Sequence, residues 1–206
     1  MHLNDEPTVG IILAGGRASR MHFQEKGLIE LQGRPLLAHI IERLASQVDD
    51  LWLNINRHHD IYRSFNLQII VDDPAFVGMG PLAGVHAALE AFGCLSPAAG
   101  WLVVCSCDSP FLPLDLVGRL IFAARAAKTK ASVAWDGHHL HPTFCGVHSS
   151  LLPSVKQQLI QGEPRFGQWL KTIPAARVDF SDKPEAFINI NTPNDLNNIK
   201  ESLKQF

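Results

Sequence analysis

Short, mostly apolar runs recur along the chain, and each is closed by glycine or by polar side chains. They cover residues 8–13, 51–56, 68–71 and 101–105. The run at 101–105 contains no polar residue, which is typical of a strand buried on both faces. We therefore predict four strands of a buried sheet from these runs.

Helical patterns lie between and after these runs. Proline stands at the start of three of them, at Pro35, Pro81 and Pro113, where the missing N–H of a first helical residue is tolerated. Leucine and isoleucine repeat at helical spacing over residues 36–44. Strands that alternate with helices predict right-handed crossover units around a mainly parallel sheet, which is an α/β fold.

The pattern changes in the last third of the chain. Residues 131–135 and 143–147 are predicted to form strands on either side of an aspartate-glycine turn. Two helical patches, a short strand at 187–191 and a terminal helix from Pro193 follow. Because neither a repeat nor a linker separates the two parts, we expect a single domain.

Composition excludes several classes of protein. The chain has 206 residues, of which 46% are hydrophobic and 18% charged, so it has enough apolar material for a packed core. Its 18 basic and 20 acidic residues give a net charge of −2, which argues against a dedicated nucleic-acid binder. No apolar run reaches the ~18 residues of a membrane span, and the first residues lack the pattern of a secretory signal.

The cysteines bear on the redox environment. Cys105 and Cys107 flank one residue of an apolar run, and Cys94 and Cys145 stand apart, so their spacing fits neither a metal site nor a disulfide framework. We expect buried, reduced thiols and a cytoplasmic protein.

Glycine and polar residues gather where the predicted strands end. In an open parallel sheet, ligands bind beyond the carboxyl ends of the strands, near the point where the strand order reverses. The residues at these ends are Gly15, Gly16, Arg17, Arg20, Lys26, Asn54, Asp72, Asp108 and Asn191. We predict a ligand site at this edge of the sheet.

The loop after the first strand fits neither the P-loop pattern nor the dinucleotide-binding fingerprint. It still offers what a polyphosphate needs. Backbone N–H groups at Gly15 and Gly16 can approach an anion closely, and Arg20 and Lys26 supply positive charge. We expect an anion site here; the structural alternative is an ordinary turn with solvated basic side chains.

A set of motifs extends over nearly the whole chain. The segments are Leu13-Ala14-Gly15-Gly16 with Arg20-Met21, Lys26-Gly27-Leu28, Leu31-Gln32-Gly33-Arg34-Pro35-Leu36, Asn54-Ile55-Asn56-Arg57, Gly80-Pro81-Leu82-Ala83-Gly84, Cys107-Asp108-Ser109-Pro110, Asp136-Gly137 with His141-Pro142-Thr143, and Asn189-Ile190-Asn191-Thr192-Pro193. Together they resemble the doubly wound nucleotidyltransferases, and most closely the molybdenum cofactor guanylyltransferases.

The resemblance implies a three-layer, Rossmann-like nucleotidyltransferase fold with a mainly parallel sheet. It also implies transfer of GMP from GTP to the terminal phosphate of molybdopterin (Mo-molybdopterin), with release of pyrophosphate. A single nucleotidyltransferase domain over residues 1–206 is expected, with a nucleotide-binding part at about 8–130 and an acceptor-binding part at about 131–206. Mg²⁺ is the expected cofactor. Transient contact with cofactor-inserting proteins or acceptor molybdoenzymes is expected, and nucleic acid and membranes are not expected partners.

The resemblance further implies roles for individual residues. GTP is expected to contact Leu13, Ala14, Gly15, Gly16, Lys26, Asn54, Asp72 and Asp108. Molybdopterin is expected to contact Gly80, Gly84, His141, Asn189 and Asn191. The expected catalytic residues are Arg20, Lys26 and Asp108, and Asp108 is also the expected Mg²⁺ ligand.

Elementary chemistry agrees with these roles. Nucleotidyl transfer brings two phosphate anions together, so Arg20 and Lys26 would offset their repulsion and stabilise pyrophosphate. Mg²⁺ usually takes one or two carboxylates plus substrate phosphates, and Asp108 follows a buried strand. Structural alternatives are open for Asp108 and Asp72 as turn residues and for Asn191 as the cap of the terminal helix.

The first loop departs from the family pattern. His22-Phe23 stands where two glycines are usual, and Glu25 stands where an aspartate is usual, so side chains there could crowd the phosphates. Two other functions stay open at this point. One is a cytidylyltransferase or a sugar-phosphate nucleotidyltransferase that uses the same loop and aspartate. The other is a non-catalytic nucleotide- or cofactor-binding module.

Overall fold

A seven-stranded central sheet runs through the computed structural model, which describes residues 6–15, 25–95 and 98–203, with side chains as far as Ile199. Across the sheet the strands are β5 (Gln68–Ile70), β4 (Asp50–Asn54), β1 (Thr8–Leu13), β6 (Trp101–Ser106), β8 (Leu140–His148), β7 (Ala131–Trp135) and β9 (Ala176–Asp179). The first four are mutually parallel, as are β7 and β9, whereas β8 runs antiparallel to both neighbours. The predicted α/β fold with a mainly parallel sheet is confirmed.

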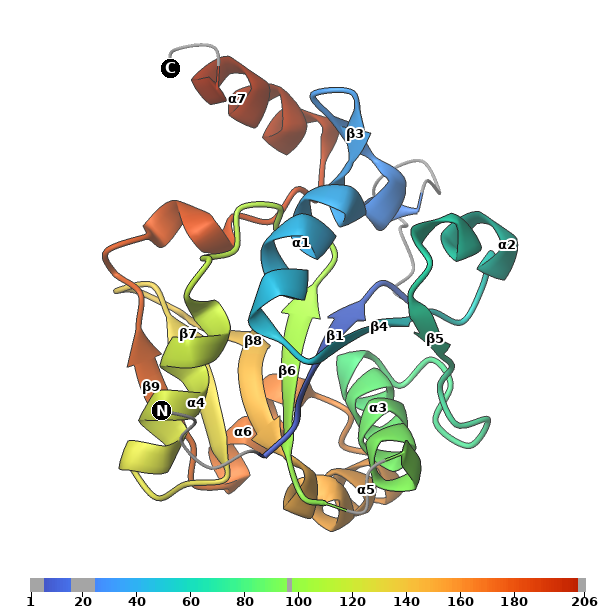
Figure 1. Ribbon diagram of the computed structural model, residues 1–206, viewed down its shortest axis with the longest axis vertical. Coiled ribbons are helices and arrows are strands. Elements are labelled where there is room, and N and C mark those ends of the chain that lie inside the picture. Colours follow the sequence, from blue (N-terminus) through green and yellow to red (C-terminus); the bar gives the residue numbers. More distant parts are fainter. Residues whose placement is uncertain (1–5, 16–24, 96–97, 204–206) are drawn as a thin grey trace.

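Helices cover both faces of this sheet (Figure 1). On one face lie α1 (Leu36–Leu44) and α4 (Leu116–Ala126), and on the other α3 (Pro81–Leu95), α5 (Leu152–Ile160) and α6 (Phe166–Thr172). Successive side chains of a strand point to opposite layers. In β6, Leu102 and Val104 pack with α3, while Val103 and Cys105 pack with α1 and α4. The fold therefore has the three layers predicted.

The strand order reverses at β1. The chain passes from β1 to β4 and β5 on one side, and then crosses through α3 to β6 on the other side of β1. Because the crossovers on the two sides leave in opposite directions, a crevice forms beyond the carboxyl ends of β1 and β6. Of the polar residues expected to bind a ligand, those that the structure describes reach this edge.

Several predicted elements have shifted ends. The strand predicted at 51–56 ends at Asn54, and the one predicted at 143–147 already begins at Leu140. The helix predicted from Pro113 begins at Leu116, after a turn in which the Leu116 N–H donates to the Pro113 carbonyl oxygen at 3.2 Å.

The sequence prediction omits several elements, among them the short helix α2 (His59–Tyr62) and β9, a short strand at the edge of the sheet. It also omits a hairpin of β2 (Glu30–Leu31) and β3 (Arg34–Pro35). Its two turn residues, Gln32 and Gly33, have φ of 53° and 74°, the left-handed backbone of a two-residue hairpin turn.

The strand predicted at 187–191 is wrong. Pro184–Phe187 form a 3₁₀ helix, and the chain then runs outside the sheet to α7 (Pro193–Leu203). The Ile190 N–H donates to the Asp108 carbonyl oxygen at 2.8 Å. Phe187 and Ile190 are buried and Ile188 is exposed. Phe187 and Ile190 are therefore buried by packing outside the sheet, not by pairing with a strand.

The start of α7 is capped by a reciprocal pair of side chains. The Asp195 N–H donates to Thr192 Oγ1 at 3.2 Å, and Asp195 Oδ2 accepts from the Thr192 N–H at 2.8 Å. This is the arrangement of a capping box. The alternative that Asn191 caps this helix is therefore wrong, and its side chain is available for the cavity described below.

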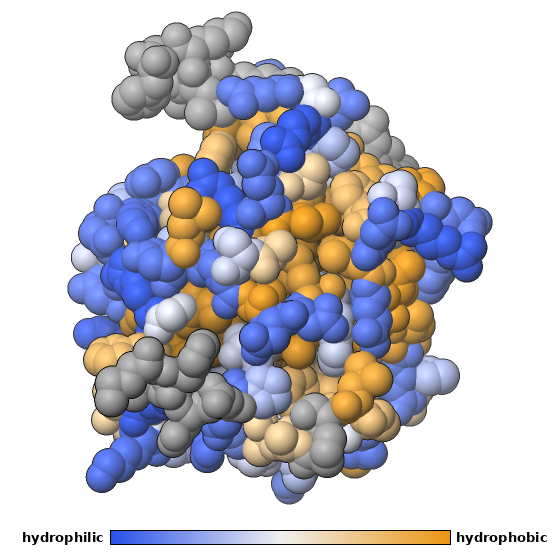
Figure 2. Space-filling view, in the orientation of Figure 1, coloured by the Kyte–Doolittle hydropathy of each residue, from blue (hydrophilic) through white to orange (hydrophobic). Residues whose placement is uncertain are grey.

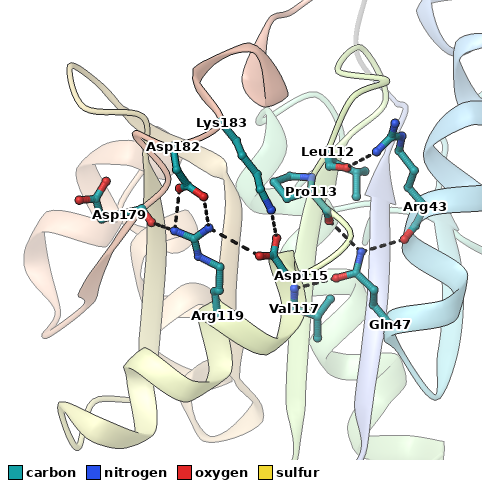
Figure 3. A network of polar contacts seen from close by, with 10 residues as sticks. All are labelled: Arg43, Gln47, Leu112, Pro113, Asp115, Val117, Arg119, Asp179, Asp182 and Lys183. Atoms are coloured by element: carbon teal, nitrogen blue, oxygen red, sulfur yellow. Dashed lines mark hydrogen bonds and ion pairs between the residues drawn. The ribbon is translucent and has the colours of Figure 1, made fainter.

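Polar side chains hold the connection between β6 and α4 in place (Figure 3). Gln47, just after α1, donates through Nε2 to the Pro113 carbonyl oxygen at 2.9 Å. Its Oε1 accepts from the Val117 N–H at 3.0 Å. From the other side, Lys183 Nζ donates to Asp115 Oδ1 at 2.8 Å. The end of this connection, at residues 113–117, is thus held by hydrogen bonds from Gln47 on one side and from Lys183 on the other.

The face seen in Figure 2 mixes apolar and hydrophilic surface. Hydrophilic side chains gather at its left edge and over α2 (His59–Tyr62), with apolar surface between them. Ile41 and Phe65 are among the partly buried side chains that pack against the core in the layer of α1. Folded proteins commonly expose such surface, so it does not by itself mark a binding site.

All four cysteines are free thiols. Cys105, Cys107 and Cys145 are buried, as predicted, whereas Cys94 on α3 is exposed and departs from the prediction. In the part of the chain that the structure describes, no helix is both long and apolar enough to cross a membrane.

Gly84 lets α3 approach the end of β4. A Cβ placed there would lie 2.3 Å from Asn54 Oδ1 and 3.0 Å from Leu13 Cδ2. We predict that Gly84→Ala lowers the free energy of unfolding, measured in urea, by about 1–3 kcal/mol, the usual cost of overpacking.

Gly93→Ala is the matched control in the same helix. No described atom lies within 4 Å of a Cβ at Gly93, so this change is expected to be neutral or to raise stability by about 0.5–1 kcal/mol. Equal losses in the two variants would contradict the packing argument.

His86 on α3 is buried edge-on to Phe76, with ring centroids 5.0 Å apart. Burial lowers the pKa of its imidazole, although the Glu90 carboxylate, 3.5 Å away, favours the protonated form. The unfolded chain therefore takes up this proton more readily than the folded one. Stability is lost as the pH falls through the ordinary histidine pKa of about 6.5.

We predict that the free energy of unfolding falls between about pH 7.5 and pH 5.5, and that His86→Leu reduces this fall because the proton uptake is removed. Urea unfolding at the two pH values measures the difference. The same fall in both proteins would show that other groups control it.

Candidate active site

A cavity of about 710 Å³ opens beyond the carboxyl ends of β1, β4, β5 and β6. Residues from the first loop, the strand ends, the start of α3 and the C-terminal third line it: Leu13, Ala14, Gly15, Lys26, Asn54, Asn56, Arg57, Asp72, Val77, Gly78, Gly80, Pro81, Ser106, Cys107, Asp108, Thr143, Asn189 and Asn191. Most of the predicted site residues are among them.

The first loop begins as a continuation of β1. The Ala14 N–H donates to the Asn54 carbonyl oxygen at 2.9 Å, which extends the ladder one residue past the strand. A Cβ at Gly15 would lie 3.0 Å from Asn56 Nδ2, so the bare backbone leaves room for that amide. The remaining loop positions of the sequence prediction lie outside the described residues: Gly16, Arg17, Arg20 and His22-Phe23.

Three polar side chains form the wall next to β4 and β5. Asn54 Nδ2 donates to Asp72 Oδ1 at 2.8 Å and to the Ile70 carbonyl oxygen at 3.2 Å. Asn56 Nδ2 donates to Asp72 Oδ2 at 2.7 Å. In the turn that follows β5, it is the Asp73 carboxylate that accepts a hydrogen bond from the Ala75 N–H, at 2.9 Å. Asp72 is therefore part of the cavity wall and not merely a turn residue.

Lys26 and Asp108 meet inside the cavity. Lys26 Nζ lies 3.2 Å from Asp108 Oδ2 and also donates to Asn191 Oδ1. Ser106 Oγ donates to the other carboxylate oxygen. The exposed fractions of the two charged side chains are 27% and 9%. The lysine is therefore not a solvated surface residue, and the aspartate directs its charge into the cavity.

The C-terminal segment completes the opposite wall. Ser109 Oγ donates to Asn189 Oδ1 at 2.6 Å, which ties this segment to the loop after β6. Asn189 and Asn191 both line the cavity, as their spacing of two residues predicts, even though the segment is not a strand. Two side chains from near the end of the sequence thus reach the ends of the parallel strands.

Two of the predicted site residues that the structure describes, Gly84 and His141, do not line the cavity. Gly84 lies within α3, where it makes room for Asn54. His141 Nε2 lies 2.8 Å from Asp136 Oδ2, and its ring stacks on Phe187 with centroids 4.7 Å apart. Hydrogen bonds from backbone N–H groups and from His141 lower the pKa of Asp136, so this carboxylate stays ionised beside the imidazole.

Sequence reasoning assigned no role to several residues that line the cavity: Asn56, Arg57, Gly78, Pro81, Ser106 and Thr143. A signal existed for two of them. Asn56 follows Asn54 by two residues, and Thr143 belongs to a motif in which only His141 was singled out.

A cysteine nucleophile does not fit this site. Cys107 lines the cavity, but burial raises the pKa of its thiol to about 12, with the nearby Asp108 carboxylate acting in the same direction. The reactive thiolate is therefore scarce at neutral pH. The geometry favours direct displacement between bound substrates over a covalent intermediate on this residue.

The donor set fits a metal that is shared with a substrate. Among the described residues, no group of three or more histidine, cysteine or acidic side chains could hold an ion alone. Mg²⁺ is usually held by one or two carboxylates plus substrate phosphates. Asp108 is a nearly buried carboxylate that lines the cavity beside amide oxygens, so it suits that mode of binding.

Comparisons with known proteins identify the family of the chain. Residues 10–176 match the family model of the MobA-like NTP transferase domain. A molybdenum cofactor guanylyltransferase of Yersinia pseudotuberculosis is 42% identical over 186 residues, covering 90% of this chain and 91% of that protein. A Yersinia pestis protein of the same name matches equally well.

Solved structures share the fold. Molybdopterin-guanine dinucleotide biosynthesis protein A from Archaeoglobus fulgidus superposes with a TM-score of 0.79 at 21% identity, covering 96% of this chain and all of that one. A 4-diphosphocytidyl-2C-methyl-D-erythritol synthase from Anaerococcus prevotii gives a TM-score of 0.70 at 18% identity, covering 97% of this chain and 96% of that one.

The family model covers most of the chain, and the relatives match along almost their whole length. The cavity brings Lys26, Asp108 and Gly15 together at one edge of the sheet. The protein is a nucleotidyltransferase, and the chain belongs to the MobA-like NTP transferase family that includes the molybdenum cofactor guanylyltransferases.

Proposed function

We propose that the protein transfers GMP from GTP to the terminal phosphate of molybdopterin, forming the guanine dinucleotide cofactor and releasing pyrophosphate. The names of its relatives support this choice of nucleotide and acceptor. The observation that carries the proposal is the approach of Lys26 Nζ to within 3.2 Å of Asp108 Oδ2 inside the cavity. There, the Lys26 ammonium group can offset the negative charge of two phosphorylated substrates, and the Asp108 carboxylate can bind a cation shared with them.

The nucleotide is proposed to lie against the first loop and the ends of β4 and β5. Leu13, Ala14 and Gly15 offer backbone with little side-chain bulk, which lets a ligand approach N–H groups closely. Asn54 and Asp72 supply polar contacts beside this loop.

The acceptor is proposed to lie toward the C-terminal third, in the part at about 131–206. Thr143, Asn189 and Asn191 reach the cavity from this part of the chain. Gly80, at the start of α3, borders the same space with a φ of 78°. Hydroxyl and amide groups suit an oxygen-rich acceptor because they can donate hydrogen bonds to phosphate.

Lys26 is proposed to stabilise the reacting phosphates. An oxygen of the acceptor phosphate attacks the α-phosphorus of GTP, and a new P–O bond forms while the bond to the β-phosphate breaks, so that pyrophosphate leaves. Positioning and charge neutralisation do most of the work in such transfers. The ammonium group already points into the cavity, held by Asp108 and Asn191, and can donate to phosphate oxygens instead.

Asp108 is proposed to hold Mg²⁺ together with the phosphates. When bound, the ion would offset negative charge on the triphosphate. The Ser106 hydroxyl donates to Asp108 Oδ1 and fixes the carboxylate in place, while Oδ2 faces Lys26. The orientation of Asp108 therefore does not depend on the bound substrate.

A cytoplasmic location and transient contact with cofactor-inserting or acceptor proteins are also proposed. Four free thiols support a reducing environment.

The proposal is tested by incubating the protein with molybdopterin, Mg²⁺ and each labelled nucleoside triphosphate in turn. We expect GTP-dependent release of pyrophosphate and formation of the guanine dinucleotide. Turnover with CTP while GTP stays inert would identify a cytidylyltransferase instead. Binding of GTP without pyrophosphate release would indicate a non-catalytic module.

Replacing Asp108 by asparagine keeps the shape of the side chain and removes its charge. We predict that Asp108→Asn lowers kcat by about 10²–10³-fold, as is typical when one preorganised electrostatic contact is lost. Steady-state pyrophosphate release measures the effect.

The matched control is Asp60→Asn on α2, whose side chain is 93% exposed; its rate should be unchanged. An Asp108→Asn rate within a few-fold of wild type, in a protein that melts normally, would remove Asp108 from the chemistry.

A further inference from the structure

Asn56 has the best-defined geometry of the cavity residues that the sequence left without a role. It lies just beyond β4, between Gly15 and Asp72. We propose that Asn56 is a positioning residue that holds Asp72 so that its carboxylate accepts hydrogen bonds from the adjacent N1–H and N2–H donors of guanine. The inference rests on the proposed use of GTP and names the contact that selects the base.

The orientation of the Asn56 amide follows from its partners. The Asp72 backbone N–H can only donate, and it lies 2.9 Å from Asn56 Oδ1. The amide nitrogen must then face the Asp72 carboxylate, where Nδ2 lies 2.7 Å from Oδ2. One side chain thus binds both the backbone and the carboxylate of Asp72, and this pair of bonds limits rotation of the carboxylate.

A second amide fixes the other carboxylate oxygen. Asn54 Nδ2 donates to Asp72 Oδ1 at 2.8 Å. A carboxylate offers about four acceptor positions, so two amide donors leave about two for a ligand. Asp72 is only 6% exposed and lines the cavity, so those positions are available to a ligand there and little exposed to bulk water.

Guanine has the complementary edge. Its N1–H and N2–H groups are adjacent donors, and a carboxylate held in one plane can accept from both. Adenine and cytosine each place an acceptor next to their exocyclic amine, and hypoxanthine lacks the amine. A buried group that is built to pair with a donor discriminates strongly against a ligand that lacks it.

The wall depends on Asn56 because, among the described residues, the side-chain hydrogen-bond partners of the Asp72 carboxylate are the amides of Asn54 and Asn56. Loss of Asn56 would free Oδ2 and the backbone N–H together. The carboxylate could then turn about its bond to Cβ and would no longer present both oxygens to one base edge.

Calorimetry of GTP and ITP binding in the presence of Mg²⁺ tests this without the acceptor. ITP carries hypoxanthine, so it differs from GTP only by the missing amine. We expect wild-type protein to bind GTP about 10-fold or more tightly than ITP, as a hydrogen bond to a charged group suggests. Asn56→Ala is expected to weaken GTP binding about 10-fold and ITP binding less, so that the ratio falls toward one.

An exchange of the two side chains separates orientation from folding. Asn56→Asp alone opposes two carboxylates and is expected to lower both the melting temperature and GTP affinity. The double variant Asn56→Asp/Asp72→Asn can re-form every hydrogen bond among positions 54, 56 and 72, with the charge moved to position 56. We expect it to regain the melting temperature but not the preference for GTP over ITP.

Asn197→Ala is the matched control, because Asn197 is an exposed asparagine of α7. It is expected to keep the wild-type GTP/ITP ratio. An unchanged ratio in Asn56→Ala overturns the inference, and so does a ratio near one in the wild type or a double variant that regains the ratio together with the melting temperature. Selective GTP binding without transfer to molybdopterin would instead overturn the proposed function alone.

Discussion

The reversal of strand order at β1 is the constraint on which the site depends. Parallel strands deliver their carboxyl ends to one edge, and crossovers that leave in opposite directions keep that edge open. Lys26 and Asp108 are 82 residues apart in the sequence, yet they meet there because one follows β1 and the other follows β6. Without that reversal a crossover would cover the edge.

An open edge lined by buried polar groups is costly unless each group finds a partner. The structure supplies those partners within the wall: Asp72 binds two amides, and Asp108 binds a hydroxyl and an ammonium. Space for them comes from glycine. Gly15 leaves room for the Asn56 amide, and Gly84 leaves room for Asn54 beneath α3. These glycines therefore leave room for the hydrogen-bonded side chains of the wall, in addition to any room that they leave for a ligand.

Sequence alone predicts the central sheet well, because strands buried on both faces are continuous apolar runs with polar ends. It locates Lys26, Asp72 and Asp108 by the same logic, since strand ends converge. It does not distinguish burial outside the sheet from burial within it, and the apolar run at 187–191 therefore predicts a strand that the structure lacks. The short hairpin at 30–35 has too few residues to show an alternating pattern.

Other failures concern contacts made only in three dimensions. Gly84 belongs to a motif, but a sequence cannot show whether a missing side chain accommodates a ligand or a neighbouring amide. His141 also belongs to a motif, yet it stacks on Phe187 and pairs with Asp136. The sequence does not single out Asn56, because its hydrogen bonds are made with Asp72, which lies 16 residues away beyond the end of a different strand.

The direction of β8 has a consequence for how two substrates are brought together. Since β8 runs against β6, it is the beginning of β8 that lies beside the end of β6. The register pairs Val104 with Cys145, so two residues further along, Ser106 and Thr143 border the cavity from adjacent strands. Main-chain pairing of β6 with β8 thus sets the spacing between the proposed nucleotide and acceptor sides of the cavity.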